Sequence, residues 1–209
     1  MSRLKHDHFG AIDHVDGHIR RDTRVASFGL RWIARLIAAR EARALEQLRG
    51  LDGVPQLIGF DGRVLDRSFM DGQAMDAARP RGDLKYFRAA RALLRAVHAR
   101  GVAHNDLAKE ANWLVRADGS PALLDFQLAM RGAPRARWFR MLAREDLRHL
   151  LKHKRTYCAE SLTPVERRVL ARKSWIARAW MRSGKKVYIF IARKIFKWED
   201  NEARGRRHL

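Results

Sequence analysis

One stretch of the chain, residues 104–127, constrains the fold more than any other. It begins with His-Asn-Asp-Leu-Ala-Lys-Glu-Ala-Asn and ends with Leu-Leu-Asp-Phe-Gln. Between these ends, two short apolar segments flank Asp118-Gly119, a dipeptide typical of tight β-hairpin turns. The pattern predicts a polar loop followed by a small hairpin. Asn112 and Asp125 then lie at the same end of that hairpin.

The polar side chains of this stretch form a set of hard oxygen ligands. It brings together two carboxylates, Asp106 and Asp125, and one carboxamide, Asn112. Such oxygens suit Mg²⁺, and phosphoryl transfer needs positioning and charge neutralisation more than covalent chemistry. The set therefore predicts Asn112 and Asp125 as metal ligands. Asp106 is left over to orient a hydroxyl group.

The same stretch resembles the catalytic and metal-binding loops of the protein-kinase-like superfamily. The pattern of that family is His-x-Asp-Leu, an Asn shortly after, and then Asp-Phe-Gly. The upstream residues 94–104, Leu-x-x-x-His-x-x-Gly-Val-x-His, also resemble the helix and turn that lead into this loop. Over residues 15–130 the chain is most similar to RIO-type kinases and to the Kdo/heptose lipopolysaccharide kinases of bacteria.

The resemblance implies both a fold and a reaction. The fold is α+β and protein-kinase-like, with a reduced N-terminal sheet lobe and a helical C-terminal lobe. It divides one continuous domain into a reduced N-lobe (1–72), a C-lobe core (73–130) and a basic helical part (131–209). The implied reaction is Mg²⁺-dependent transfer of the γ-phosphate of ATP to a hydroxyl, either of a protein Ser/Thr or of a lipopolysaccharide-core sugar.

Roles in the catalytic loop also follow from the resemblance. Asp106 would orient the attacking hydroxyl, Lys109 would stabilise charge on the transferring phosphate, and His104 would brace the loop. The spacing from Asp106 to Asn112 is six residues instead of the family's five, and Lys109 also lies one position later than usual. One inserted residue explains both departures. Gln127 replaces the Gly of Asp-Phe-Gly, which suggests a less mobile metal loop.

The nucleotide clamp departs further from the family pattern. The glycine-rich loop is absent, and Arg20 and Arg21 stand at the candidate positions for the strand lysine that holds the phosphates. Arginine keeps the charge in a wider, planar head, and the sequence does not decide between the two positions. Met70 is expected where a kinase hinge would read the adenine edge.

Glu41 lies on an amphipathic helix predicted over Leu30–Leu48. It falls on the apolar stripe, where a carboxylate needs a partner from another element. The resemblance assigns it to pairing with the strand cation that replaces lysine. The alternative is an ordinary surface ion pair, but no basic residue lies three or four positions away along the helix.

Further helices are predicted outside this frame. Asp83 caps a helix that runs to His98, and a second helix covers 145–154. Thr163-Pro164-Val165-Glu166 is a capping-box signature, so a helix is expected from Pro164 to about residue 181. Residues 1–14 are rich in His and Asp, and we expect a solvated, partly ordered N-terminus there, with a metal site as the alternative. Asp16-Gly17 predicts a turn between two short strands, His14-Val15 and His18-Ile19-Arg20.

Charge is concentrated in the C-terminal part of the chain. The net charge is +21, and residues 131–209 hold 23 Lys/Arg against 7 Asp/Glu. Aromatic and cationic side chains mix over 187–198, which suits peripheral contact with an anionic membrane; nucleic acid is the less favoured partner. The third interpretation is a C-terminal helix with a solvated basic face.

Location and an alternative function complete the expectations. A single cysteine, Cys158, fits a reducing compartment, and no apolar signal segment begins the chain. We therefore expect a cytoplasmic protein, with peripheral contact at the inner membrane as an option. The alternative function is a catalytically inactive kinase-like module that binds anionic membrane or RNA through its basic tail. Oligomeric state does not follow from the sequence.

Overall fold

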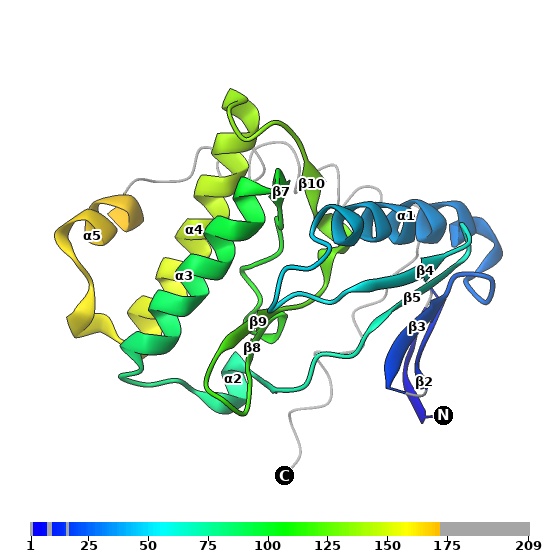
Figure 1. The fold of residues 1–209 in the computed structure, drawn as a ribbon, viewed down its shortest axis with the longest axis horizontal. Coiled ribbons are helices and arrows are strands. Elements are labelled where there is room, and N and C mark those ends of the chain that lie inside the picture. Colours follow the sequence, from blue (N-terminus) through cyan, green and yellow to red (C-terminus); the bar gives the residue numbers. More distant parts are fainter. Residues whose placement is uncertain (1, 8–9, 16, 172–209) are drawn as a thin grey trace, which may run out of the picture. The chain divides into compact units, whose positions relative to one another are not determined.

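The computed structural model describes residues 2–7, 10–15 and 17–171, and the structural statements below concern these residues. By its internal contacts the chain divides into two units, Met1–Arg167 and Arg168–Leu209. The first unit holds a sheet lobe followed by a mainly helical lobe (Figure 1). The aromatic and cationic segment 187–198 lies outside the described residues.

The N-terminal lobe is built on a five-stranded antiparallel sheet of order β1-β2-β3-β5-β4. Two of its strands come from residues 2–15, where we expected a partly ordered segment, and the short strands predicted at His14-Val15 and His18-Ile19-Arg20 are confirmed as parts of longer ones. Backbone pairing of β2 with β3 holds this segment, and such pairing needs no stripe of apolar side chains. The strands are β1 (Ser2–Asp7), β2 (Gly10–Val15), β3 (His18–Asp22), β4 (Leu57–Phe60) and β5 (Val64–Ser68).

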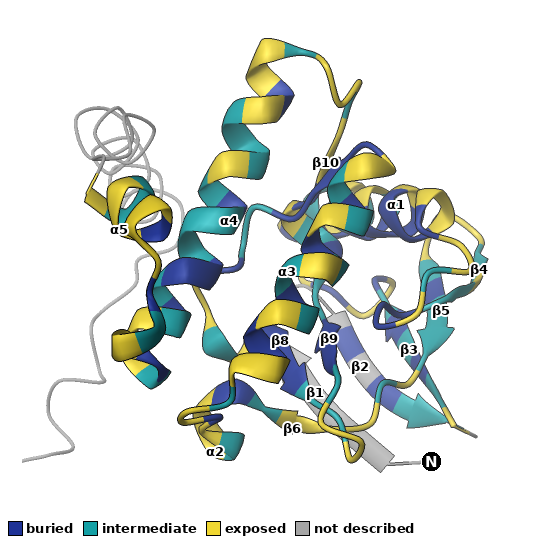
Figure 2. Ribbon diagram, turned by 60° about the vertical axis from the view of Figure 1, so that its left-hand side comes forward, coloured by how far each residue is buried: buried dark blue, intermediate teal, exposed yellow. Residues whose placement is uncertain are grey.

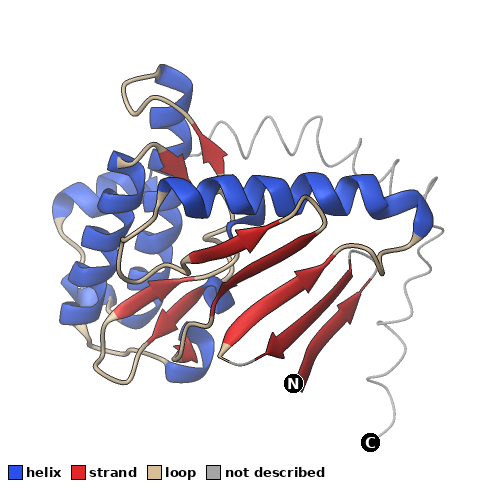
Figure 3. Ribbon diagram, turned by 45° about the vertical axis from the view of Figure 1, so that its right-hand side comes forward, coloured by secondary structure: helices blue, strands red, loops and turns tan. Residues whose placement is uncertain are grey.

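One long helix, α1 (Arg31–Gln47), lies along a face of this sheet (Figure 3). A short 3₁₀ turn, Phe28–Leu30, leads into it. Its buried stripe is mostly alanine, and Glu41 belongs to that stripe. The helix predicted over Leu30–Leu48 is confirmed. Small side chains on the stripe let the helix backbone approach the sheet closely.

The link to the second lobe leads into a small three-stranded sheet of order β6-β8-β9. The strands are β6 (Gln73–Ala74), β8 (Trp113–Val115) and β9 (Pro121–Leu123). Gly119 has φ +76° in the turn between β8 and β9, which is the left-handed conformation that the Asp-Gly dipeptide predicts. The predicted hairpin is therefore confirmed. A short helix, α2 (Met75–Ala78), follows β6.

The helical lobe contains α3 (Leu84–Ala99) and α4 (Arg137–Tyr157), which run side by side (Figure 1). The helix capped by Asp83 is confirmed, because this carboxylate accepts the N–H of Tyr86 at 2.8 Å. The predicted helix at 145–154 is longer than expected. Its first two turns are rich in arginine and show no continuous apolar stripe, but the buried Phe139 anchors them.

Shorter elements complete the lobe. The ladder between β7 (Val102–Ala103) and β10 (Met130–Arg131) joins the segments on either side of the catalytic loop. Three 3₁₀ turns lie at Glu110–Asn112, Phe126–Leu128 and Ala159–Ser161.

The last described helix is α5 (Pro164–Ala171). The predicted capping box is present: the N–H of Glu166 donates to Thr163 Oγ1 at 3.2 Å, and Glu166 Oε2 accepts the N–H of Thr163 at 3.0 Å. The expected continuation of this helix to about residue 181 lies outside the described residues.

The main core fills the space between α1, α3 and the hairpin β8–β9. Figure 2 shows β9 and most of β8 as buried, and the fully buried Trp113 lies on β8. Leu45, Leu94 and Phe126 belong to the same cluster, so the helix that carries Glu41 and the residue after Asp125 share one core. No helix among the described residues is both long and apolar enough to cross a bilayer.

Candidate active site

One buried carboxylate binds the backbone of the loop that precedes Asp106. Asp146, on α4, is 1% exposed and accepts the backbone N–H groups of His104 at 2.8 Å and Asn105 at 2.9 Å. The ring Nε2 of His98 lies 3.0 Å from the same carboxylate. Asn105 has φ +65°, a left-handed conformation that L-residues rarely adopt. The α4 carboxylate thus stabilises a strained backbone next to Asp106.

His104 links this loop to the segment that carries Asp125. Its Nδ1 accepts the backbone N–H of Asp106 at 3.3 Å, and its Nε2 lies 2.7 Å from the carbonyl oxygen of Leu124. The ring also packs on Phe126, with centroids 4.6 Å apart. Because Nδ1 accepts, Nε2 must carry the proton and donate to the carbonyl. The buried imidazole therefore has both nitrogens occupied, as a bracing residue would.

Asp106, Lys109 and Asn112 form one connected polar group. Asp106 Oδ2 lies 2.6 Å from Lys109 Nζ and 3.1 Å from Asn112 Nδ2, which also donates to the carbonyl oxygen of Asp106 at 2.8 Å. The hydrogen bond to Asp106 raises the pKa of Lys109 above its ordinary value. The carboxamide oxygen of Asn112 is left available for a cation.

Asp125 follows β9 at the same end of the hairpin. The N–H of Leu124 donates to the carbonyl oxygen of Asn112 at 2.9 Å, so Asn112 and Asp125 flank one backbone contact. Asp125 has φ +62°, and strained backbone of this kind concentrates at functional sites. Its Oδ1 is buried and has no hydrogen-bond partner within the described residues. The positive charges of Lys109 and Arg67 both act on this carboxylate.

This arrangement fits a divalent cation of the Mg²⁺ type. A buried carboxylate oxygen without a hydrogen bond is costly, and a hard cation would satisfy it. The described part of the chain contains no group of three or more His, Cys, Asp or Glu side chains that could bind a metal ion without other ligands. Mg²⁺ commonly takes one or two protein ligands and completes its shell with phosphate and water oxygens. Asn112 and Asp125 suit that role.

Glu41 is paired, as its position on the apolar stripe requires. It is 1% exposed; Arg21 Nε on β3 lies 3.7 Å from its Oε2, and Arg67 Nε on β5 lies 3.2 Å from its Oε1. Burial lowers the pKa of Arg67, and the nearby charge of Arg21 lowers it further, while Glu41 and Asp125 oppose the shift. Two guanidinium groups thus share one carboxylate. The site has one cation in excess on the side of Asp125.

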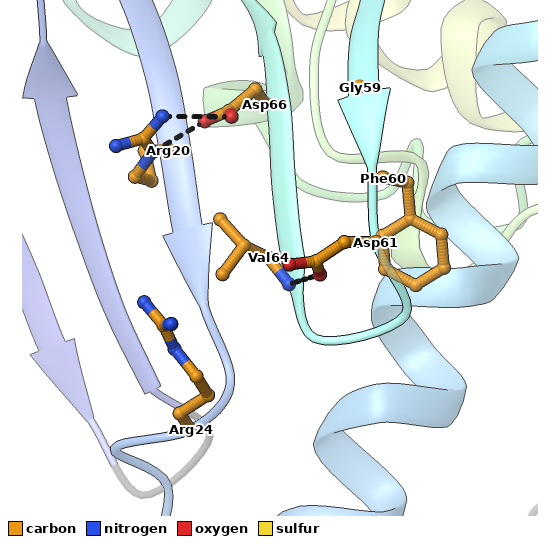
Figure 4. Close-up of a pocket in the computed structure, with 7 residues that line it drawn as sticks. All are labelled: Arg20, Arg24, Gly59, Phe60, Asp61, Val64 and Asp66. Atoms are coloured by element: carbon orange, nitrogen blue, oxygen red, sulfur yellow. Dashed lines mark hydrogen bonds and ion pairs between the residues drawn. The ribbon is translucent and has the colours of Figure 1, made fainter.

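The structure does not bring Arg20 to this group. Side chains alternate along a strand, and Arg20 lies on the sheet face opposite Glu41. There it donates to both oxygens of Asp66 at 2.8 and 3.0 Å, and these bonds raise its pKa (Figure 4). It borders a shallow hollow of about 470 Å³ with Arg24 and Phe60. Of the two positions that the sequence left open, Arg21 is the one that reaches Glu41.

Met70 lies in the connector between β5 and β6. It is partly buried and borders a separate hollow of about 420 Å³, together with Leu51 and Gln56. No described hydrogen bond joins its side chain to the group around Asp106. Its assignment to the adenine edge stays a prediction.

Sequence reasoning missed Arg67 and Asp146. Both had a signal of the kind that singled out Glu41, namely a charged residue at an apolar position. Arg67 lies on the strand Val64–Ser68, two residues after the buried Leu65, and side chains two residues apart on a strand share a face. Asp146 lies four residues before the buried Leu150 on the inner face of α4. The partner of each charge, however, comes from a distant part of the chain.

Comparison with known proteins supports the same interpretation. The RIO domain family matches residues 1–164. A solved structure of the Rio2 kinase from Chaetomium thermophilum is similar with a TM-score of 0.57 at 17% identity, covering 77% of this chain and 58% of that one. The ADP/Mg²⁺-phosphoaspartate complex of the Rio2 kinase from the same organism gives 0.56 at 15% identity, covering 88% and 66%.

The chain therefore spans less than two thirds of either Rio2 structure. A search of curated protein sequences gave no match. At these identities the structures show the fold, and the predicted α+β protein-kinase-like fold is confirmed. Because the family match covers more than half of the chain, the protein belongs to the RIO domain family.

Proposed function

We propose that this protein transfers the γ-phosphate of ATP to an acceptor group in a Mg²⁺-dependent reaction. The observation that carries the proposal is the connected group of Asp106, Lys109 and Asn112 beside the buried, unpartnered oxygen of Asp125. Membership of the RIO domain family supports it, as does the presence of ADP and Mg²⁺ in the similar Rio2 complex.

Each residue of the group has a role in this reaction. Asp106 accepts a hydrogen bond from the acceptor hydroxyl and aims its oxygen at the phosphate. Lys109 and Asn112 hold that carboxylate in place, and the ammonium charge offsets charge that develops on the transferring group. Asn112 and Asp125 would hold Mg²⁺, whose charge would offset that of the phosphates. His104 fixes the backbone between the two loops and contacts no reacting atom.

Arg21 and Arg67 supply the cationic wall on the sheet side of the site. Glu41 offsets one of the two positive charges and the other is left to attract nucleotide phosphates. We propose that this pair of arginines takes the place of the single lysine found in protein kinases.

The phosphoryl acceptor is either a protein Ser/Thr hydroxyl or a sugar hydroxyl of a lipopolysaccharide core. The second option rests on the resemblance to Kdo/heptose kinases, and it fits the excess of basic residues in 131–209. An anionic glycolipid acceptor would place the protein in the cytoplasm with peripheral contact at the inner membrane.

The rival function is a catalytically inactive module that binds anionic membrane or RNA. The substitution at Arg21 favours it, because this residue stands where kinases use lysine. The two functions differ in whether phosphate leaves ATP at all.

The test is Mg²⁺-dependent ATP turnover by the full chain and three variants that each replace one carboxylate by its amide. We expect Asp106→Asn and Asp125→Asn to lose at least about 100-fold in kcat. Asp118→Asn is the matched control, since Asn-Gly forms the same hairpin turn as Asp-Gly. Turnover that survives in both site variants, or is absent from the wild type despite Mg²⁺-ATP binding, would refute the proposal.

The acceptor is identified in the same samples. Phosphate on Ser or Thr stays with the protein, phosphate on a lipopolysaccharide-core sugar stays with the glycolipid, and hydroxylamine removes only phosphate on a carboxylate. The carboxylate arm is included because the similar Rio2 complex holds a phosphoaspartate. If hydroxylamine removes the labelled phosphate, the acceptor is a carboxylate and not the hydroxyl group proposed here.

A further inference from the structure

An exposed surface follows directly after the segment that carries Asp125. We call it the arginine surface and define it as the exposed side chains of residues 128–144. No acidic residue occurs between Asp125 and Glu145. The surface combines three large apolar side chains with five arginines: Leu128, Met130, Trp138, Arg131, Arg135, Arg137, Arg140 and Arg144.

The five arginines have no counter-ion among the described residues and follow one another within fourteen positions. None forms an ion pair or a side-chain hydrogen bond with any described residue. Elsewhere, arginines such as Arg24, Arg49 and Arg116 are each paired with a nearby carboxylate. Within the described part of the chain, no carboxylate offsets the positive charge of the arginine surface.

Helix stability does not explain these arginines. Arg137 and Arg140 lie in the first turn of α4, where the helix dipole favours acidic residues and disfavours cations. This turn has no acidic residue and no side-chain cap. Arg144 continues the same helix face at a spacing of four residues. A local conflict of this kind, repeated along one face, is expected where the surface serves a function.

The apolar side chains of the surface are large and held in place. Leu128 is 45% exposed, and Met130 and Trp138 are each 44% exposed. The indole of Trp138 lies against Gly132, where a Cβ atom would come within 2.2 Å of the ring, and its edge contacts Phe139. A larger residue at this position would displace the indole from where it lies. The exposed part of the ring is available to a partner.

The arginine surface adjoins the candidate active site. Strand β10, which carries Met130 and Arg131, pairs with β7, and β7 ends at the residue before His104. The side chain of Asn105 donates to the carbonyl oxygen of Leu128 at 3.2 Å. Figure 2 shows the loop between β10 and α4 as largely exposed. A partner bound here would lie next to the loop that holds Asp106.

We propose that the arginine surface docks the protein on a membrane rich in anionic phospholipid. Unpaired arginines would bind lipid phosphates, while Trp138, Leu128 and Met130 would enter the headgroup region. A nucleic acid would use the arginines equally well, but two of the three apolar side chains are aliphatic and offer no base-stacking face. The mixture therefore favours a lipid surface. This docking does not depend on phosphoryl transfer.

The test is co-sedimentation of the full chain with vesicles of phosphatidylcholine alone or mixed with phosphatidylglycerol. We expect binding to the mixed vesicles only. The triple variant Arg137→Gln/Arg140→Gln/Arg144→Gln should bind them about 100-fold more weakly, since each surface cation contributes about fivefold. Trp138→Ala should weaken binding with little change in its salt dependence, because it removes an apolar contact.

The matched control removes three exposed arginines from elsewhere, as Arg81→Gln/Arg88→Gln/Arg95→Gln. It carries the same net charge as the first triple variant and should keep nearly all vesicle binding. Equal losses in the two triple variants, or none in either, would overturn the proposal and leave general charge or the basic tail as the cause. Loss of binding to polyuridylate RNA without loss on vesicles would assign the surface to nucleic acid instead.

Discussion

Glu41 and its two arginines show how one buried carboxylate organises charge between the sheet and α1. Each charge lies in a region nearly closed to water, with exposed side-chain fractions of 1% for Glu41, 10% for Arg21 and 12% for Arg67. Removing one member of a buried ion pair costs far more than the pair itself contributes. Because the cluster already has an excess cation, its members should not be equally sensitive to substitution.

We predict that Glu41→Gln is more destabilising than Arg67→Met. The first change leaves two close guanidinium groups without a carboxylate and should cost about 3–5 kcal/mol. The second leaves a balanced pair of Arg21 and Glu41 and keeps most of the buried apolar volume. Urea denaturation of both variants measures the difference. In the double variant, Arg67→Met should restore part of the free energy of unfolding that Glu41→Gln removes. If the two losses in free energy simply add, the two arginines do not share the carboxylate.

At the scale of elements, α4 supports the catalytic loop through Asp146. We predict that Asp146→Asn lowers kcat with little change in the KM for ATP, because the residue acts through the backbone of His104 and Asn105 and not on the nucleotide. Asparagine can still accept one of the two backbone bonds, so the fold should survive. Steady-state kinetics separate the two constants. A variant that raises KM alone would place Asp146 outside the positioning role.

A second element-scale link ties α1 to the helical lobe. Arg100 follows α3, and its Nη1 donates to the carbonyl oxygens of Leu48 at 2.9 Å and Arg49 at 2.8 Å, just beyond the end of α1. In return, Gln47 Nε2 donates to the carbonyl oxygen of Arg100. These bonds satisfy carbonyls that a helix end leaves without partners. They hold the helix that carries Glu41 at a fixed position.

We therefore predict that Arg100→Ala destabilises the fold by about 1.5–3 kcal/mol, the usual contribution of hydrogen bonds to a charged group. Hydrogen exchange should quicken at the last turn of α1. Arg95→Ala is the control, since this arginine lies on α3, is exposed and has no described partner. Equal effects of the two substitutions would mean that the contact of Arg100 with the end of α1 does not contribute to the stability of the fold.

Local signals in the sequence predicted much of this arrangement. The Asp-Gly turn predicted the hairpin, and the apolar stripe with its lone carboxylate predicted both α1 and the need of Glu41 for a partner. The identity of the partners could not be predicted, since Arg67 and Asp146 meet their counterparts only after strands and helices distant in sequence have packed. The N-terminal strands were predicted only next to the Asp16-Gly17 turn, because the rest of them is held by backbone pairing, which leaves little trace in side-chain pattern.

At the scale of the whole molecule, acid should weaken the fold in two stages. Burial lowers the pKa of His149 below its ordinary 6.5, and Lys152 adds to this. A group with a lowered pKa binds its proton more readily when unfolded, so its stabilising effect is present above pH 6.5 and is lost as the pH falls through that region. The hydrogen bond from Arg24 lowers the pKa of Asp22 below 3.8, so a second loss follows in stronger acid.

Thermal unfolding across this pH range tests the order of the two stages. His149→Gln should flatten the first decline and leave the second unchanged, because glutamine takes up no proton. Asp22→Asn should do the reverse. A first decline of full size in His149→Gln would assign it to another histidine.

The link between β10 and α4 is only five residues long, from Gly132 to Ala136. Many kinases place at this point a long segment whose covalent modification turns the enzyme on. Here there is no length in which to install such a switch, and α1 is already anchored in place by Arg100. If the chain is the phosphotransferase we propose, its described catalytic residues come together without any rearrangement of this link. We expect turnover that needs no covalent modification between β10 and α4.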